Sequence, residues 1–142
     1  MATVQQDQYI EMTVGGENYA IKIEDIHEII KMQAITDLPH SKFYVKGIIN
    51  LRGMVVPVVS LRNMFGMADE AYTKATRIVV VHHQEEAVGI IVDQVNKVTT
   101  YPEVQPPPVQ MGSVNGAFFS GIGLRGQHLV GILKLDEVLL QE

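Results

Sequence analysis

Residues 50–61 of the chain read NLRGMVVPVVSL, an apolar run headed by an arginine that stands between Leu51 and Gly53. The guanidinium of Arg52 stays charged and carries five hydrogen-bond donors, so a partly buried arginine needs a carboxylate, backbone carbonyls or a partner molecule. The run that follows it is short and rich in valine, which is typical of a β-strand. The rest of the sequence should therefore contain both the strands that pair with this one and the partner of Arg52.

Similar β-branched clusters, each bounded by glycine or turn residues, recur along the chain. With few helical periods between them, such clusters predict an all-β barrel or sandwich. They cover residues 19–23, 47–51, 54–59, 77–81, 88–92 and 128–135.

One segment favours a helix instead. Isoleucines at positions 23, 26, 29 and 30 recur at helical spacing. The acidic residues Glu24 and Asp25 lie near its start and suit a helix N-terminus. The sequence therefore predicts a short helix that begins near residue 23.

Shorter segments complete the pattern. Residues 61–65, ended by Gly66, and residues 136–140 each predict a single short helix. Residues 67–75 are polar and small, which predicts a loop. The proline run at residues 106–108 predicts an extended connection, because proline has no backbone donor for a sheet.

The two halves of the chain resemble each other. Residues 19–29, YAIKIEDIHEI, align without gaps on residues 88–98, VGIIVDQVNKV, at an offset of 69 (88 − 19). The triplet LRG at residues 51–53 recurs at residues 124–126, at an offset of 73 (124 − 51). These matches indicate two similar β lobes, with chance similarity of strand and turn patterns as the alternative. The pattern does not reveal whether the lobes exchange strands.

Composition bounds the class of protein. A chain of 142 residues has room for one domain, or for two small lobes that share an interface. The absence of cysteine excludes disulfides and thiolate metal sites and is consistent with a reducing cytoplasm. A formal net charge of −5 with scattered basic residues argues against nucleic-acid binding. No apolar run approaches the ~18 residues of a transmembrane helix, and the first residues lack a secretory signal pattern, so we expect no membrane insertion.

Motifs associated with catalysis lack the context that they require. The sequence GIGLRG at residues 121–126 has the spacing of a dinucleotide loop, but a β-rich stretch follows where a helix would have to hold the pyrophosphate. The five histidines lack metal-ligand spacing, and no serine lies in a G-x-S-x-G motif. We expect no catalytic residue, no metal and no cofactor. A small nucleotide-dependent enzyme, which dinucleotide titration would reveal, is the alternative from another functional class.

The best candidate partner of Arg52 is Glu28. The alternation of residues 26–29 places the Glu28 carboxylate away from the isoleucine face. A bidentate pair with Glu28 at the rim of a barrel would satisfy Arg52. In a second interpretation, compatible with the first, Arg52 is only partly satisfied and presents donors to another protein, as arginine commonly does in interfaces.

With these residues in hand, the chain resembles the CheW family, the coupling proteins of bacterial chemotaxis. The signature is KGIINLRGMVVPVVSLR at residues 46–62. Supporting segments are YAIKI (19–23), IHEI (26–29), GIIVDQV (89–95), PPP (106–108) and GIG (121–123). Ser60 stands where the family often has an aspartate.

The resemblance implies an all-β fold of two SH3-like, five-stranded β-barrel subdomains with short helices, in a single CheW-like domain over residues 8–140. It implies a non-catalytic adaptor that couples the cytoplasmic tips of methyl-accepting chemoreceptors to the regulatory domain of the histidine kinase CheA. The expected location is the cytoplasm, with recruitment to membrane-associated chemoreceptor arrays. The alternatives are a coupler of a pilus-motility or developmental array, or part of a CheV-type hybrid; an end at Glu142 favours a stand-alone coupler.

A site is also implied. In the family the receptor tip, a helical hairpin, lies in a hydrophobic groove between the subdomains. Carried over by position, the receptor-binding residues are Ile26, Glu28, Gly47, Asn50, Arg52, Gly53, Val95 and Val98. The kinase contacts have no residue-level assignment, because the barrel ends that make them differ between members.

Overall fold

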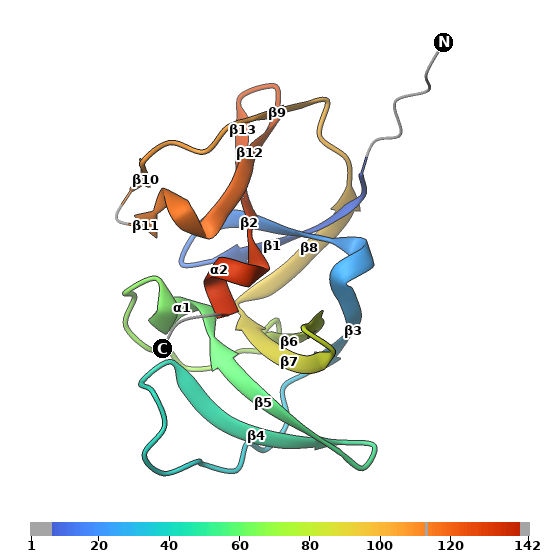
Figure 1. The fold of residues 1–142 in the computed structure, drawn as a ribbon, viewed down its shortest axis with the longest axis vertical. Helices are drawn as coiled ribbons and strands as arrows, with labels where there is room; N and C mark the ends of the chain where they lie inside the picture. Colours follow the sequence, from blue (N-terminus) through green and yellow to red (C-terminus); the bar gives the residue numbers. More distant parts are fainter. Residues whose placement is uncertain (1–6, 113, 140–142) are drawn as a thin grey trace.

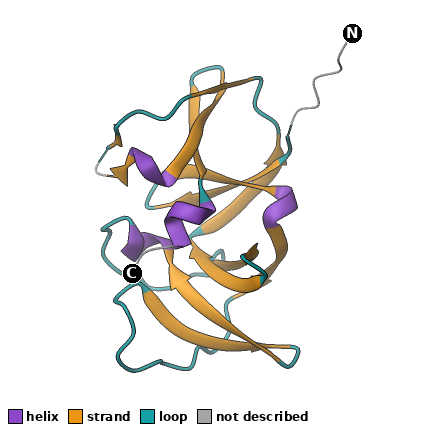
Figure 2. Cartoon of the chain, viewed as in Figure 1, coloured by secondary structure: helices purple, strands orange, loops and turns teal. Residues whose placement is uncertain are grey.

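The computed structural model describes residues 7–112 and 114–139. Within them the chain folds into strands joined by short turns and a few single helical turns (Figure 1, Figure 2). The strands of this described part form a five-stranded sheet, a six-stranded sheet and a two-stranded ribbon. The all-β prediction and the division into two β subdomains are confirmed.

The five-stranded sheet forms the subdomain in the lower part of Figure 1, which we call barrel 1. Its strands lie in the order β3 (Ile26–Lys31), β6 (Arg77–His83), β7 (Glu86–Val92), β5 (Met54–Ser60) and β4 (Val45–Leu51). Strands β5 and β7 are parallel, and the other neighbours are antiparallel. The chain beyond β3 closes the sheet onto β4, because Thr36 and Ile48 exchange two backbone hydrogen bonds of 2.9 Å.

The six-stranded sheet forms barrel 2, in the upper part of Figure 1. Its order is β8 (Gln94–Thr99), β1 (Tyr9–Val14), β2 (Glu17–Lys22), β13 (His128–Leu133), β12 (Phe119–Arg125) and β9 (Glu103–Gln105). Here β2 and β13 are the parallel pair. Strand β9 follows β8 along the chain and pairs with β12, so barrel 2 closes in the same way as barrel 1.

The remaining elements are short. They are η1 (Ile23–Asp25), α1 (Leu61–Met64), η2 (Gly116–Phe118), α2 (Leu135–Leu139) and the ribbon of β10 (Gln110–Met111) with β11 (Val114–Asn115). The predicted helix at residues 61–65 is confirmed as α1, which ends one residue earlier, and the loop at 67–75 is confirmed. The proline run at 106–108 lies outside the helices and strands. The terminal helix begins one residue before its predicted start, and its predicted last residue, Leu140, lies outside the described residues.

The helix predicted from the isoleucines near residue 23 is wrong. Only η1 is helical there, and β3 follows it at once. A β-bulge at His27 explains the misleading spacing: Ile26 pairs with Val81 and Ile29 with Val79, with one extra residue between them. The bulge puts residues three apart on the same face of a strand, which imitates the helical interval.

The register of the sheets reveals an internal repeat. An offset of 69 relates the pair Glu11 and Ala20 to the pair Val80 and Gly89 (80 − 11, 89 − 20). It also relates the bulge in β3 to one in β8, where Asn96 is the extra residue. Hairpin β4–β5 maps onto β12–β13 at an offset of 74 (128 − 54). The LRG alignment at offset 73 is therefore one residue out of structural register.

The two repeats exchange strands. The first contributes β1 and β2 to barrel 2 but β3, β4 and β5 to barrel 1. The second contributes β6 and β7 to barrel 1 but β8, β12 and β13 to barrel 2. Strands β3 and β8 are therefore the first strands after each chain crossing between barrels. The halves of the sequence are not the lobes of the structure.

The largest hydrophobic cluster lies between the barrels rather than inside either of them. This central cluster draws buried side chains from β1 and β2 of barrel 2 and from β6 and β7 of barrel 1, among them Met12, Ile21, Val79, Val81 and Ile90. Smaller clusters fill the interiors of barrel 1 and barrel 2. The burial that stabilises the fold therefore also fixes the two barrels against each other.

Candidate functional site

Arg52 lies at the tip of the β4–β5 hairpin. Leu51 pairs with Met54, so Arg52 and Gly53 form a two-residue turn, with φ of 50° and 87°. Positive φ at both central residues is the requirement of a type I′ turn, whose twist suits a hairpin. The Gly53 amide donates to Asn50 Oδ1 at 2.7 Å, which holds the turn from inside the strand.

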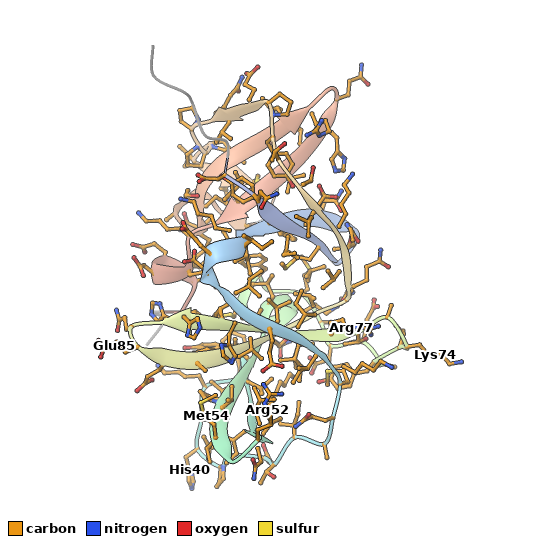
Figure 3. All side chains as sticks on the ribbon, turned by 90° about the vertical axis from the view of Figure 1, so that its right-hand side faces the viewer. His40, Arg52, Met54, Lys74, Arg77 and Glu85 are labelled. Atoms are coloured by element: carbon orange, nitrogen blue, oxygen red, sulfur yellow. The ribbon has the colours of Figure 1, made fainter. Side chains whose placement is uncertain are left out.

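The predicted pairing of Arg52 with Glu28 is confirmed. Nη2 of Arg52 donates to Oε1 of Glu28, through one nitrogen and one oxygen rather than as the expected bidentate pair. The side chain of Arg52 is 69% exposed and that of Glu28 is 24% exposed. Because exposed pairs contribute only about 0.2–1 kcal/mol, this contact links the hairpin to β3 without being a major source of stability. Figure 3 shows Arg52 and Met54 together at this end of barrel 1, below the β3 ribbon.

Two isoleucines of β3, Ile26 and Ile29, face the central cluster. Ile26 lies opposite Val81 and Ile29 opposite Val79, and directly opposed residues share a face. Both isoleucines are partly exposed and pack against that cluster. Glu28 lies opposite Val80, on the face away from both isoleucines as predicted, but the bulge at His27 places it there rather than simple alternation.

Strand β8 presents equivalent side chains from barrel 2. Val95 lies opposite Met12 and Val98 opposite Ile10, and both of these opposed residues belong to the central cluster. The internal repeat relates Ile26 to Val95 and Ile29 to Val98 (95 − 26 = 98 − 29 = 69). Val98 is 51% exposed, whereas Val95 is half-buried. We call these four residues, Ile26, Ile29, Val95 and Val98, the inter-barrel strip.

The central cluster fills the space between the barrels with the protein's own side chains, and three members of the inter-barrel strip pack against that cluster. The receptor-binding groove expected between the subdomains stays a prediction. The apolar surface is the outer edge of the cluster, carried by β3 and β8.

The other expected site residues occupy two kinds of position. Asn50, Arg52 and Gly53 are exposed at the hairpin tip, on the barrel 1 side of the strip. Gly47 is buried, and a Cβ atom built on it would lie 2.0 Å from the Thr36 carbonyl oxygen. With φ of 141°, Gly47 is required for the close approach that shuts barrel 1, which is a structural role.

Sequence reasoning left Ile29 out of the site. It shares the face of Ile26 only because of the bulge at His27, and simple alternation would place it on the opposite face. The signal that identifies it is the internal alignment, in which Ile29 matches Val98, already an expected site residue.

The start of β8 is tied to barrel 1 by an ion pair. Asp93 Oδ1 and Oδ2 accept from Arg62 Nε and Nη2 at 3.1 Å and 2.8 Å, and Oδ2 also accepts from the Gly15 amide at 2.8 Å. Burial raises the pKa of Asp93, but these hydrogen bonds outweigh it and leave the pKa below its ordinary value. The side chain of Arg62 is largely buried. This pair fixes the point at which the chain passes from β7 of barrel 1 to β8 of barrel 2.

The sequence also singled out a glycine motif and several histidines. The GIGLRG stretch lies in β12 and its hairpin turn, so no helix N-terminus follows it. His27 Nδ1 and His82 Nε2 are 3.1 Å apart on neighbouring strands. Among residues 7–112 and 114–139, no three metal-binding side chains of His, Cys, Asp or Glu converge.

None of the helices in the described part of the chain has both the length and the apolar character needed to span a membrane.

Comparison with known proteins gives consistent relatives. The CheW-like domain family matches residues 8–142. Chemotaxis protein CheW of Helicobacter pylori is 37% identical over 136 residues, covering 95% of this chain and 82% of the relative. Chemotaxis protein CheW of Bacillus subtilis is 31% identical over 138 residues, covering 96% and 88%. Protein PilI of Pseudomonas aeruginosa is 31% identical over 109 residues, covering 73% and 61%.

A solved structure shares the whole architecture. The crystal structure of the scaffolding protein TtCheW from Thermoanaerobacter tengcongensis superimposes with a TM-score of 0.89 at 30% sequence identity, covering 99% of this chain and 92% of that one.

Proposed function

The chain belongs to the family of CheW-like domains, and from this premise we propose that it couples chemoreceptors to the histidine kinase CheA. In this proposal residues 8–140 act as one domain, without catalysis, and the protein works in the cytoplasm, recruited to membrane-associated receptor arrays. The receptor tip binds at the inter-barrel strip, and the regulatory domain of CheA binds elsewhere on the barrels.

The exposed edge of the central cluster supports this assignment most directly. A helix that docks on a protein needs an apolar surface at the spacing of one helical face, with a few polar groups at its border. The inter-barrel strip supplies the apolar part from both barrels. Glu28, Asn50, Arg52 and Gly53 supply the polar border on the barrel 1 side. Contacts of this size are weak singly and gain strength from multivalency in an array.

The test is an affinity measurement with a soluble fragment of a chemoreceptor tip and, separately, with the CheA regulatory domain. Val98→Asp introduces a charge into the strip at a half-exposed position and is expected to weaken receptor binding at least tenfold, because a carboxylate loses hydration when the helix covers it. Binding to CheA is expected to stay unchanged.

Val104 offers a matched control. It is a valine of barrel 2 that is 50% exposed, compared with 51% for Val98, and it lies on β9 outside the strip. Val104→Asp is expected to leave receptor binding at the wild-type level. Equal effects of the two substitutions, or none from Val98→Asp, would reject the strip as the receptor site.

The similarity to PilI supports a second candidate, a coupler of a pilus-motility array. That match covers less of both chains than the matches to the chemotaxis proteins. The two candidates share the adaptor role and differ in partners. Stronger binding to the kinase and receptor fragments of a pilus system than to their chemotaxis counterparts would favour the second.

A further inference from the structure

Barrel 2 carries a buried carboxylate where barrel 1 carries a valine. Glu11 of β1 is 3% exposed, and the internal repeat relates it to Val80 of β6, which is 0% exposed (80 − 11 = 69). Val80 belongs to the apolar interior of barrel 1. The same strand order and closure are therefore formed with an aliphatic side chain at this position.

Four contacts satisfy Glu11. The Tyr101 hydroxyl donates to Oε1 at 2.9 Å, Asn96 Nδ2 donates to Oε2 at 3.4 Å, and His128 Nε2 lies 3.3 Å from both oxygens. Burial raises the pKa of Glu11, but the bonds from Tyr101, Asn96 and His128 outweigh it and leave the pKa below its ordinary value. Glu11 is therefore ionised at neutral pH.

A buried charge is an expensive way to stabilise a barrel. Removing a carboxylate from water costs several kcal/mol, and well-packed apolar replacements of buried ionic groups are often neutral or stabilising. Barrel 1 demonstrates such a replacement at the equivalent position. The network around Glu11 is thus better explained by where it holds its neighbours than by the stability it adds.

The neighbour that matters is Asn96, the bulge residue of β8. It stands between Val95 and Lys97 in the strand that carries half of the inter-barrel strip. Asn96 Nδ2 also donates to Thr13 Oγ1 at 3.0 Å, so Glu11 and Thr13, both on β1, hold the bulge residue by hydrogen bonds. These two hydrogen bonds therefore join β1 to β8, the strand that forms the barrel 2 wall of the strip.

The two walls of the strip differ in what holds them. On β3, both Ile26 and Ile29 pack against the central cluster. On β8, Val95 packs there but Val98 is half exposed. The β8 wall has less apolar packing, so its position depends more on polar contacts from β1.

We propose that Glu11 is a positioning residue. Through its hydrogen bond with Asn96 it holds the β8 bulge in place, and it thereby keeps Val95 and Val98 in the position that a docked helix requires. This inference rests on the proposed function, because it names what prepares the receptor surface. It assigns no contact between Glu11 and the receptor.

The decisive variant is Glu11→Val, which installs the residue found at the equivalent position of barrel 1. We expect its melting temperature to fall, because the buried Tyr101 hydroxyl loses its acceptor. In the folded variant, affinity for a chemoreceptor tip fragment should also fall, by about tenfold, within the range typical of coupling between sites. Hydrogen exchange is expected to accelerate in residues 94–99 of β8 and to stay unchanged in residues 26–31 of β3. A purely structural role would lower stability but leave the affinity of the folded protein unchanged.

Two further variants keep the test decisive. Asn96→Ala cuts the link to β8 while leaving Glu11 with Tyr101 and His128, and should reproduce the loss of binding even if Glu11→Val fails to fold. Glu11→Gln keeps one acceptor oxygen, which can accept from Asn96 Nδ2, while the new amide nitrogen can donate to the Tyr101 hydroxyl oxygen. It should therefore retain affinity within about twofold.

Wild-type exchange of β8 together with wild-type affinity in Glu11→Val and Asn96→Ala would overturn the proposal. So would a loss of affinity in Glu11→Gln as large as in Glu11→Val. If Val98→Asp leaves receptor binding intact, the proposed receptor site is wrong, and the exchange of β8 in Glu11→Val still decides whether Glu11 positions the strand.

Discussion

Barrel 1 and barrel 2 share strand order, a parallel pair, a bulge and a closing strand, yet their interiors differ. Seven buried aliphatic residues from β4, β5, β6 and β7 fill barrel 1. Barrel 2 uses Tyr9, Tyr101, Ala20, Val130 and Ile132 around the carboxylate of Glu11. The pattern of turns and alternation therefore fixes the topology, and the identity of the interior side chains leaves room for other demands.

The bulges show the same division. In barrel 1 the bulge residue His27 contacts His82 at 3.1 Å, and in barrel 2 the bulge residue Asn96 contacts Thr13 at 3.0 Å. Both pairs occupy equivalent places in the repeat (96 − 27 = 82 − 13 = 69). The geometry is retained while the chemistry changes, and the two bulge residues lie in β3 and β8, the strands that carry the inter-barrel strip.

The largest expected effect concerns the two glycines where the barrels close. Gly47 faces Thr36, and Gly121 faces Gln105 in the equivalent place (121 − 47 = 74, 105 − 36 = 69). Gly47→Ala should lower the free energy of unfolding by about 3–4 kcal/mol, because the new Cβ meets a backbone carbonyl at 2.0 Å and φ is 141°. Gly121→Ala should cost about 1–2 kcal/mol, because the new Cβ would lie 2.8 Å from Val104 Cγ1 and 3.0 Å from the Gln105 carbonyl oxygen, which is a milder clash. Urea unfolding measures both, and equal losses would contradict this account of closure.

The next prediction concerns the tie between the barrels. Arg62→Ala should cost about 1–2 kcal/mol, because it removes two hydrogen bonds to the half-exposed carboxylate of Asp93. The repeat relates Arg62 to Asp136 (136 − 62 = 74), whose side chain is largely exposed. Asp136→Ala should change stability by less than about 0.5 kcal/mol. Thermal unfolding of both variants compares them, and a larger loss from Asp136→Ala would mean that the barrels are held on the other side.

The two barrels should differ in their sensitivity to acid. Glu11 and Asp93 have pKa values below their ordinary values of 4.5 and 3.8, so their contribution to stability is present above those values and is lost as pH falls through the lower folded values. Amide exchange at decreasing pH should expose β1 and β8 before β6 and β7. Glu11→Gln should reduce that difference. Earlier exposure of β6 and β7 would show that these carboxylates do not set the order.

The smallest expected effect lies at the hairpin tips. Arg52 has φ of 50° inside a type I′ turn, whereas its sequence match Arg125 ends β12 outside the turn. Arg52→Asn should raise the free energy of unfolding by up to about 0.5 kcal/mol, because the gain from asparagine in the turn exceeds the loss of the exposed pair with Glu28. It should also weaken receptor binding, because the guanidinium is lost. Arg125→Asn should bring no gain in a thermal melt; a comparable gain there would show that backbone strain at Arg52 is not the cause.

Much of the fold can be read from the sequence where strands are continuously apolar. The clusters that became β2, β4, β5, β6, β7 and β13 were all predicted. Strands β1, β8 and β12 were missed for physical reasons: Glu11 interrupts the first, polar residues dominate the second, and glycines the third. The interior of barrel 2 accepts a buried carboxylate and close backbone approach, which apolar periodicity does not detect.

The candidate site was predictable only in part. The sequence correctly suggested Glu28 as the partner of Arg52 at a barrel rim, although the bulge, and not alternation, turns Glu28 away from the isoleucines. A single inserted residue in β3 hid the alignment of Ile26 with Ile29 and suggested a helix. Strand exchange left no trace in the internal alignment, because two similar halves align equally well whether each half folds on itself or lends strands to the other.

That exchange has a practical consequence. A cut within residues 67–75, between the two repeats, would produce two fragments, each holding an incomplete set of strands for both barrels. Neither fragment would contain a complete hydrophobic core, so each would fold only when bound to the other. The two repeats therefore depend on each other for folding as the subunits of an obligate heterodimer do. This makes the protein a suitable scaffold for a split reporter that assembles when its two fragments bind.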